Sequence, residues 1–308
     1  MTPRRVLVTG GAGFIGSHLV EALAARGERV VVYDNLSMGR HENLPPDVPL
    51  IHADVRDTAA LSAAMQHADT VFHLAARVSV RDSLRSFAED ADVNLFGTLR
   101  MLEACAAARP RRLIFASSMA VYADSPRPDP VPETYCTAPL SPYGVSKLAA
   151  EQYVLQLAPR FGVEPVVLRF FNTYGTRQTD TPYVGVISIF VRRLLAGQAP
   201  TIFGDGGQCR DFVHVSDIVA GCLLAMESPR AGIVANIGTG IATSVNALAA
   251  LLCARIAPQI RPQHGPNQPG ELRNCVADIT AARELLGYAP RASLAEKLAE
   301  VIEYLRRE

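Results

Sequence analysis

This sequence of 308 residues has few lysines, no C-x-x-C pair of cysteines and no net charge. Only Lys147 and Lys297 are lysines, and thirty basic residues are balanced by thirty acidic ones. A chain without net charge has no field to attract nucleic acid or an anionic membrane, so neither is an expected partner. The six cysteines are scattered without a C-x-x-C pair, which indicates reduced core or pocket thiols in a cytosolic (cytoplasmic) protein.

Long apolar runs and metal-binding spacings are missing too. No stretch of 18 or more apolar residues predicts a membrane span, and glycines interrupt the N-terminal apolar run, which is typical of a strand and loop rather than a cleavable signal. The seven histidines show neither H-x-x-x-H nor H-x-x-E-H spacing, so we expect no metal site. With 49% apolar and 19% charged residues, the composition is that of a soluble protein with a sizeable core.

Short β-branched runs alternate with helical patterns in the first half of the chain, which predicts an α/β fold with a doubly wound parallel sheet. The expected strands are Arg5–Thr9, Val30–Asp34, Leu50–His52, Thr70–Leu74, Leu113–Ser117 and Pro165–Phe170. The expected helices are Ile15–Arg26, Thr58–His67, Asp92–Ala108 and Tyr143–Ala158, followed after residue 170 by Tyr183–Gly197, Ser216–Ser228, Ser244–Arg255 and Ser293–Arg306. A proline-rich connection, residues 123–142, is expected to wall one side of a functional site, because irregular loops of this length are seldom idle.

One of the two lysines follows a tyrosine by one helical turn, in Tyr143-Gly-Val-Ser-Lys147, 25 residues after Ser118. With nine tyrosines and two lysines, random placement would give roughly 0.06 such matches. Residues four apart share a helix face, so the ammonium can favour the phenolate and move the tyrosine pKa toward the working range of a general base. The alternative is a surface helix on which Tyr143 packs and Lys147 is solvated.

A glycine-rich turn follows the first expected strand, with Gly10, Gly13 and Gly16 opening a helix. Such glycines let backbone amides approach a pyrophosphate at the helix N-terminus. Asp34 ends the next strand 18 residues later, where a carboxylate accepts from a ribose 2′-hydroxyl and repels a 2′-phosphate, so NAD is favoured over NADP. Asp54 and Val55 are candidates to hold the adenine, although Asp54 also fits a loop cap.

The chain resembles the extended short-chain dehydrogenase/reductase family. The stretches that carry the resemblance are those above together with His73-Leu-Ala-Ala76, Ser117-Ser118, Arg169-Phe-Phe-Asn-Thr-Tyr-Gly175 and the segment Gly204–Asp217. Within it, the chain is most similar to NAD-dependent nucleotide-sugar epimerases of the UDP-glucose (UDP-galactose) 4-epimerase type. The resemblance implies a Rossmann-like NAD-binding domain at residues 1–170. It implies a smaller, mainly substrate-binding lobe at residues 171–308, with some elements returning to the first domain.

The resemblance also implies roles for individual residues. Tyr143 would be the base, Lys147 its cationic partner and a ligand of the nicotinamide ribose, and Ser118 a proton relay to the sugar. The other expected cofactor contacts are Phe14, Ile15, Asn35, Ser37, Gly39, Leu74, Ala75, Ala76, Asn94 and Phe170. The other expected substrate contacts are Val78, Asn172, Gly185, Val186, Arg210, Gln268, Glu271 and Cys275. Asn172 could instead cap a turn, and Arg210 could pair with Asp211.

Departures from the family pattern narrow the reaction. Related dehydratases and decarboxylases carry an acidic residue just after the serine, whereas this chain has Met119 and Ala120, which favours 4-epimerisation. Gln268 replaces an arginine that usually reaches the diphosphate, and Arg273 is a candidate substitute.

Val78, Gly185 and Cys275 are small or apolar where narrow-pocket relatives are larger. They either admit a 2-acetamido group, so that UDP-GlcNAc/UDP-GalNAc would be accepted, or only relieve backbone crowding.

We therefore expect a UDP-sugar 4-epimerase that forms a homodimer through the helices near 94–108 and 143–158, as relatives do. The alternatives are a UDP-glucuronate 4-epimerase, with Arg77, Arg81 or Arg85 near the carboxylate, and a keto-sugar reductase. A dinucleotide-sensing regulator is a further alternative from a different class, but it would not need the serine, tyrosine and lysine together.

Overall fold

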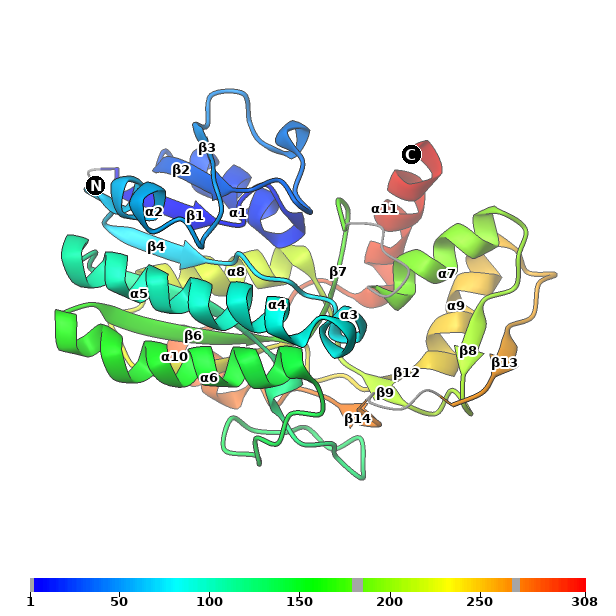
Figure 1. Ribbon diagram of the computed structural model, residues 1–308. Helices are drawn as coiled ribbons and strands as arrows, with labels where there is room; N and C mark the ends of the chain where they lie inside the picture. Colours follow the sequence, from blue (N-terminus) through cyan, green and yellow to red (C-terminus); the bar gives the residue numbers. More distant parts are fainter. Residues whose placement is uncertain (1–2, 179–184, 268–271) are drawn as a thin grey trace.

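A seven-stranded parallel sheet forms the centre of the protein (Figure 1), whose computed structural model describes residues 3–178, 185–267 and 272–308. The strands are β1 (Arg5–Thr9), β2 (Arg29–Asp34), β3 (Leu50–His52), β4 (Thr70–His73), β5 (Arg112–Ser118), β6 (Glu164–Phe170) and β11 (Ile233–Ile237). Their order, β11-β6-β5-β4-β1-β2-β3, reverses between β1 and β4. In a doubly wound sheet, ligands bind in the crevice that this reversal opens at the carboxyl ends of the strands.

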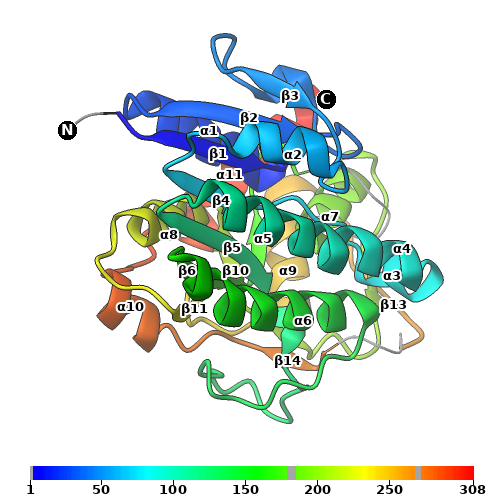
Figure 2. The same cartoon turned by 60° about the vertical axis from the view of Figure 1, so that its left-hand side comes forward.

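Helices cover both faces of the sheet, as Figure 2 shows. One face packs against α1 (Phe14–Ala25), α8 (Val215–Glu227) and α10 (Thr280–Leu286), and the other against α2 (Thr58–Met65), α5 (Gly97–Ala108) and α6 (Pro142–Leu157). Neighbouring residues of one strand point to opposite layers. In β1, Val6 and Val8 belong to the core on the α1 side, and Leu7 belongs to the core on the α5 side. The α/β fold class predicted from the sequence is confirmed.

Short helical segments connect β4 to α5 above the carboxyl edge of the sheet. They are α3 (Val80–Arg85), α4 (Phe87–Ala91) and a π-helical turn, Asp92–Phe96, which runs directly into α5. The 3₁₀ turns are His41–Asn43, Met119–Val121 and Ala158–Phe161.

The smaller lobe is built around α7 (Val186–Leu195), α9 (Val245–Ile256) and α11 (Leu294–Arg307), which share a separate apolar core. Its short strands are β7 (Asn172–Tyr174), β8 (Thr201–Phe203), β9 (Cys209–Arg210), β10 (Phe212–His214), β12 (Thr243–Ser244), β13 (Gln263–Gly265) and β14 (Asn274–Cys275). β11, α8 and α10 come from the second half of the chain but pack with the main sheet. In the part of the chain that the structure describes, no helix is both long and apolar enough to cross a bilayer.

Candidate active site

A cavity of about 1240 Å³ lies at the carboxyl edge of the sheet and extends to the smaller lobe. Pockets for one small ligand measure roughly 300–1,000 Å³, so this cavity has room for a dinucleotide and a second ligand. Most of the residues predicted from the sequence line it. They are Gly10, Gly13, Phe14, Ile15, Gly16, Asp34, Asn35, Ser37, Gly39, Val55, Leu74, Ala75, Ala76, Val78, Ser118, Tyr143, Lys147, Phe170, Asn172, Gly185, Val186 and Arg210.

The glycine loop forms a cradle that side chains would fill. Gly10 adopts φ +69°, and a Cβ placed on Gly16 would lie 2.1 Å from the carbonyl oxygen of Gly10. α1 starts after Gly13 without a side-chain cap, and its first helical hydrogen bond comes from the Ser17 amide. The amides of Ala12 and Gly13 already donate to Asp34 and to the Gly10 carbonyl oxygen. The amides of the first helical turn, from Phe14 to Gly16, come before the first helical bond and can therefore meet an anion such as a pyrophosphate, which fits a dinucleotide.

Asp34 borders the same cavity at the end of β2 and is 7% exposed. Its two carboxylate oxygens accept from the amides of Ala12, at 2.9 Å, and Leu36, at 2.8 Å. These backbone bonds fix the carboxylate against the glycine loop, and each oxygen retains a second lone pair. This arrangement suits a ribose hydroxyl and opposes a 2′-phosphate.

Ser118, at the end of β5, and Tyr143, in the first turn of α6, meet at the cavity wall. The Ser118 side chain lies close enough to the Tyr143 hydroxyl to favour its ionised form. The Ser141 side chain caps α6 and Pro142 occupies its first turn, which directs Tyr143 toward the sheet edge. Tyr143 is 8% exposed and Lys147 is 3% exposed, so the alternative in which Lys147 is solvated on a surface helix is wrong.

Lys147 lies one turn further along α6 and is only 3% exposed. Its Nζ is 4.3 Å from the centre of the Phe115 ring. Burial lowers the pKa of Lys147 to about 8, against the opposing charges of Asp90 and Glu151. Burial, together with the charge of Lys147, lowers the pKa of His73 to about 3, so that imidazole is neutral.

The electrostatics of Tyr143 differ from the sequence-based expectation of a lowered pKa. Burial raises the pKa of Tyr143 to about 12, the Ser118 side chain opposes the shift, and the charge of Asp90 adds to it. The desolvation cost of a buried phenolate therefore exceeds the help of its neighbours in the protein alone. A further positive charge in the cavity would favour the phenolate.

Two predicted cofactor residues are not in the cavity lining. Asp54 instead pairs with Arg56 through both carboxylate oxygens, at 2.8 and 2.9 Å, and accepts from Asn35, which keeps its pKa well below the usual range. Asn94 is 1% exposed and clamps the backbone of Arg77 with bonds of 2.8 and 3.0 Å. Both therefore brace segments that line the cavity.

The predicted substrate contacts are only partly brought together. Cys275 is 1% exposed in the core and does not line the cavity, so its small size does not widen the pocket directly. Arg273 holds Asp205 with two bonds, at 2.7 and 2.9 Å, and also lies outside the lining, which argues against its replacing the missing arginine. Gln268 and Glu271 lie outside the described residues.

The alternative role of Asn172 as a turn cap finds no support. Among the described residues the Asn172 Oδ1 atom has no hydrogen-bond partner, so it caps no turn there. Arg210 donates to the carbonyl oxygens of Cys209, at 2.9 Å, and Arg273, at 3.2 Å. Asp211 accepts from Thr239, Gly240 and Ala277, and its pairing with Arg210 stays a prediction.

The proline-rich connection contributes less to the wall than expected. Of its residues only Leu140 and Ser141 line the cavity. Its middle is anchored away from the site, where the Val131 amide donates to Val276 at 2.8 Å. In Figures 1 and 2 this connection lies near β14, at the lower edge of the molecule.

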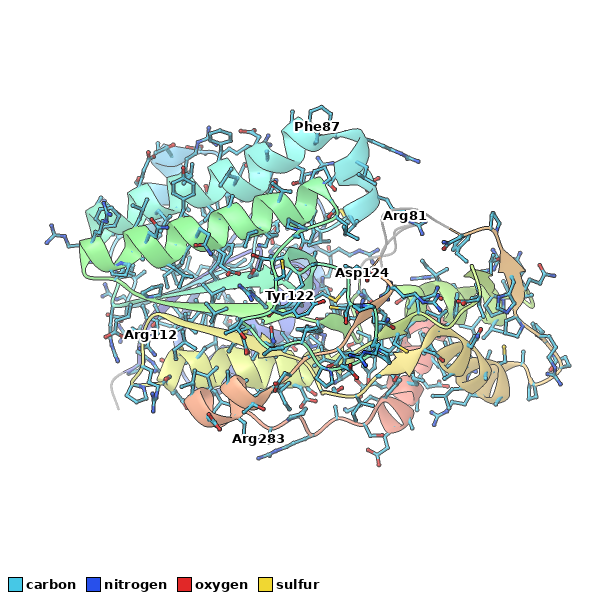
Figure 3. All side chains as sticks on the ribbon, turned by 90° about the horizontal axis from the view of Figure 1, so that it is seen from below. Arg81, Phe87, Arg112, Tyr122, Asp124 and Arg283 are labelled. Atoms are coloured by element: carbon cyan, nitrogen blue, oxygen red, sulfur yellow. The ribbon has the colours of Figure 1, made fainter. Side chains whose placement is uncertain are left out.

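Several residues that line the cavity were not predicted from the sequence, chiefly arginines and residues of strand β8. Arg56 and Arg193 line the cavity, as do Ile202, Phe203 and Gln208. Arg81, on α3, is one of the arginines named from the sequence, and its guanidinium lies 5.7 Å from the centre of the Phe203 ring, between the two parts of the protein (Figure 3). The sequence signal of Arg56 and Arg193 was weak, because such arginines are indistinguishable in sequence from solvated ones.

Comparison with known proteins places this architecture in a family. The chain matches the model of the NAD dependent epimerase/dehydratase family over residues 6–238. It is 37% identical to the UDP-glucose 4-epimerase of Mycolicibacterium smegmatis over 99% of each chain.

Two solved structures are similar over nearly their whole length. The UDP-glucose 4-epimerase of Thermotoga maritima, with UDP-glucose, has a TM-score of 0.94 and 40% identity, covering 98% of this chain and 99% of that one. The UDP-N-acetylglucosamine 4-epimerase of Methanobrevibacter ruminantium, in complex with UDP-N-acetylmuramic acid, has a TM-score of 0.93 and 34% identity, covering 99% and 98%. The resemblance inferred from the motifs is confirmed: this chain belongs to the NAD dependent epimerase/dehydratase family, with the extended short-chain dehydrogenase/reductase fold and NAD as its cofactor.

Proposed function

We propose that the protein is a UDP-sugar 4-epimerase that interconverts UDP-glucose and UDP-galactose and also accepts UDP-N-acetylglucosamine. The main support is the neighbouring pair Ser118 and Tyr143 with the buried ammonium of Lys147 one turn away, all lining one cavity. This set can remove and return a proton at a sugar hydroxyl, which is the acid–base chemistry that epimerisation through a keto sugar requires.

Each side chain has a defined part in this chemistry. Tyr143 accepts the proton of the sugar O4 and later returns it, while Ser118 hydrogen-bonds the same oxygen and helps the proton to move. Lys147 stabilises the phenolate electrostatically. The glycine loop and Asp34 hold NAD, which when bound supplies the hydride acceptor and a further positive charge.

The residues after Ser118 disfavour the competing reactions of the family. Met119 and Ala120 both line the cavity, and neither can donate or accept a proton. Dehydration and decarboxylation need an additional acid or base at this place, whereas 4-epimerisation does not.

The first experiment is incubation of the purified protein with UDP-glucose or UDP-N-acetylglucosamine without added NAD, followed by proton NMR of the anomeric signals. We expect the C4 epimer of each to form. Tyr143→Phe should reduce kcat by roughly 10²–10⁴-fold, because the general base is lost, while NAD remains bound. Turnover by Tyr143→Phe at the wild-type rate, or consumption of one NADH per sugar as in a keto-sugar reductase, would contradict the proposal.

A second candidate is a UDP-glucuronate 4-epimerase. Arg77, Arg81 and Arg85 all line the cavity, and Arg77 pairs with Glu89. A guanidinium beside the sugar would offset the C6 carboxylate. UDP-glucuronate belongs in the same NMR assay, where a kcat/KM at least tenfold above that for UDP-glucose would favour this alternative.

A further inference from the structure

The peptide unit between Ala12 and Gly13, in the middle of the glycine loop, is held by residues outside that loop. Its carbonyl oxygen accepts two hydrogen bonds, from the Arg40 amide at 3.1 Å and from the side-chain Nδ2 of Asn43 at 3.0 Å. Its amide group donates to the Gly10 carbonyl oxygen at 3.2 Å. A peptide unit is planar, so bonds at both of its ends fix its orientation.

The orientation of this peptide sets the start of α1, because the helix begins at the next residue, Phe14. The first-turn amides, which can meet a pyrophosphate, follow the peptide directly. The Ala12 amide also donates to Asp34 at 2.9 Å, so the same residue connects the glycine loop to the carboxylate that suits a ribose hydroxyl. Contacts that hold Ala12 therefore hold two parts of the cofactor site.

Asn43 reaches this carbonyl oxygen from a turn that is itself anchored. It ends the 3₁₀ turn His41–Asn43, and its amide donates to the Arg40 carbonyl oxygen at 3.1 Å. The next residue, Leu44, is 9% exposed and anchors the turn in the core on the α1 side. Asn43 does not line the cavity, so it acts on a cofactor through Ala12.

Arg177, after β7, holds Asn43 from the other side. Its Nη2 donates to the Glu21 carboxylate on α1 at 2.6 Å, and its Nη1 donates to the Asn43 carbonyl oxygen at 3.4 Å. The backbone of Arg177 is left-handed, with φ +63°, which costs free energy for residues other than glycine. Such conformations persist where surrounding contacts impose them, and they are frequent at ligand-binding sites.

We propose that Asn43 is a positioning residue for NAD. By donating to the Ala12 carbonyl oxygen it keeps the glycine loop in the form that binds the pyrophosphate, and Arg177 keeps Asn43 in place. The expected consequence is slow release of NAD. NAD is the cofactor of the family, so this role does not depend on which sugar reacts at Tyr143.

Exchange of bound NAD against isotopically labelled NAD measures its release from the complete protein. Asn43→Asp keeps the size of the side chain but places an oxygen in front of the Ala12 carbonyl oxygen, so NAD should leave at least about fivefold faster. Arg177→Gly should speed release by about two- to fivefold, because Asn43 loses a support. Glu42→Gln is the matched control: Glu42 is exposed in the same turn, and exchange should stay within about twofold of the wild-type rate.

Urea denaturation of the cofactor-free variants separates this role from a purely structural one. Glycine adopts the left-handed conformation without steric cost, so Arg177→Gly should keep the wild-type unfolding midpoint although it releases NAD faster. Release at the wild-type rate from Asn43→Asp, or faster release only in variants whose midpoint also falls, would overturn the proposal. Should Asn43→Asp not fold, Arg177→Gly decides the question by the same two measurements. If the wild type bound no NAD, the cofactor itself would be wrong, and the role of Asn43 with it.

Discussion

At the residue scale, burial disfavours the charged forms of both Tyr143 and Lys147. Burial raises the pKa of Tyr143 to about 12 and lowers that of Lys147 to about 8. Asp90, which is 1% exposed, is held by Ser146 at 2.8 Å and by Asn94 at 3.0 Å, and its charge favours the protonated form of Lys147. We therefore regard Asp90 as a positioning residue that helps to maintain the cation beside the phenol.

This arrangement predicts a break in the pH dependence of activity near the pKa of Lys147. Below about pH 8, kcat/KM should rise with pH, because the deprotonated fraction of Tyr143, whose pKa is about 12, increases while Lys147 stays protonated. Above about pH 8, Lys147 loses its proton and the phenolate loses its counter-charge, so the rise should stop and kcat/KM should level off. Replacing Asp90 by asparagine removes a charge that raises the pKa of Lys147, so the break should move to lower pH.

A pH profile of kcat/KM from 6 to 10 for the wild type and Asp90→Asn measures this shift, since kcat/KM reports groups of the free enzyme. Asp92→Asn is the control, because that carboxylate is 42% exposed and pairs with Arg56. A break at the same pH in wild type and Asp90→Asn would show that Asp90 does not support Lys147.

The predicted residues that line the cavity are placed there by local geometry. Ser118, Tyr143 and Lys147 share the cavity lining because a strand end and a helical turn place them there. Asp54 and Cys275 could not be placed in this way. Whether a carboxylate faces the cavity or turns back depends on a partner such as Arg56, and the burial of Cys275 depends on distant segments.

At the element scale, six strands of the main sheet were predicted to within one residue at each end, because buried parallel strands have a clear pattern of β-branched residues. α3, α4 and α10, with six, five and seven residues, were missed since such short helices show little periodicity. β11 was missed because it lies far along the chain, although it pairs with β6.

α6 is tied to β6 by a buried ion pair behind the catalytic edge. Glu151, on α6, is 0% exposed and accepts from Arg169 at 3.1 and 2.5 Å. Glu151 also accepts from Ser117 at 2.8 Å, and Arg169 donates to Tyr122 at 2.9 Å (Tyr122 is labelled in Figure 3). Because Glu151 follows Lys147 by one turn, the pair fixes the helix that carries the site.

Arg169→Met should lower the free energy of unfolding by about 3–5 kcal/mol, because it leaves a buried carboxylate without its cation. Urea denaturation measures the change. Arg160→Met is the control, since Arg160 is exposed and the expected change is within about 0.5 kcal/mol. Arg169→Met/Glu151→Leu should recover part of the loss. A cost below about 1 kcal/mol for Arg169→Met would contradict this account.

At the scale of the whole molecule, the chain does not divide simply at residue 170. Residues 171–308 supply the smaller lobe but also β11, α8 and α10, which pack with the main sheet. The sequence indicated that some elements return, but not which, because pairing between distant strands leaves no local pattern. The exact division into domains stays a prediction.

The outer face of α5 and α6 carries exposed apolar side chains. Phe96, just before α5, is 50% exposed, and Val145 and Tyr153, on α6, are 54% and 45% exposed. α5 and α6 lie side by side in Figures 1 and 2. Phe87, on α4, is 66% exposed, and Figure 3 shows it pointing outward from the same layer. Large apolar side chains gathered on one face are typical of an interface.

We propose that this face joins two copies of the chain in a homodimer, with α5 and α6 of each copy forming a four-helix contact. Val145 and Tyr153 lie eight residues apart on one side of α6, so they can face the same partner. Light scattering after size-exclusion chromatography should give the mass of two 33.1 kDa chains at micromolar concentration.

Val145→Glu/Tyr153→Glu should give single chains, because four carboxylates would be desolvated at the contact. Ile241→Glu is the control: Ile241 is 66% exposed but lies between β11 and β12, away from this face. A single-chain mass for the wild type, or a dimer that persists in the double variant, would rule out this interface. Because both substitutions lie on the outer face of α6 while Tyr143 and Lys147 face the cavity, the separated chains should still bind NAD.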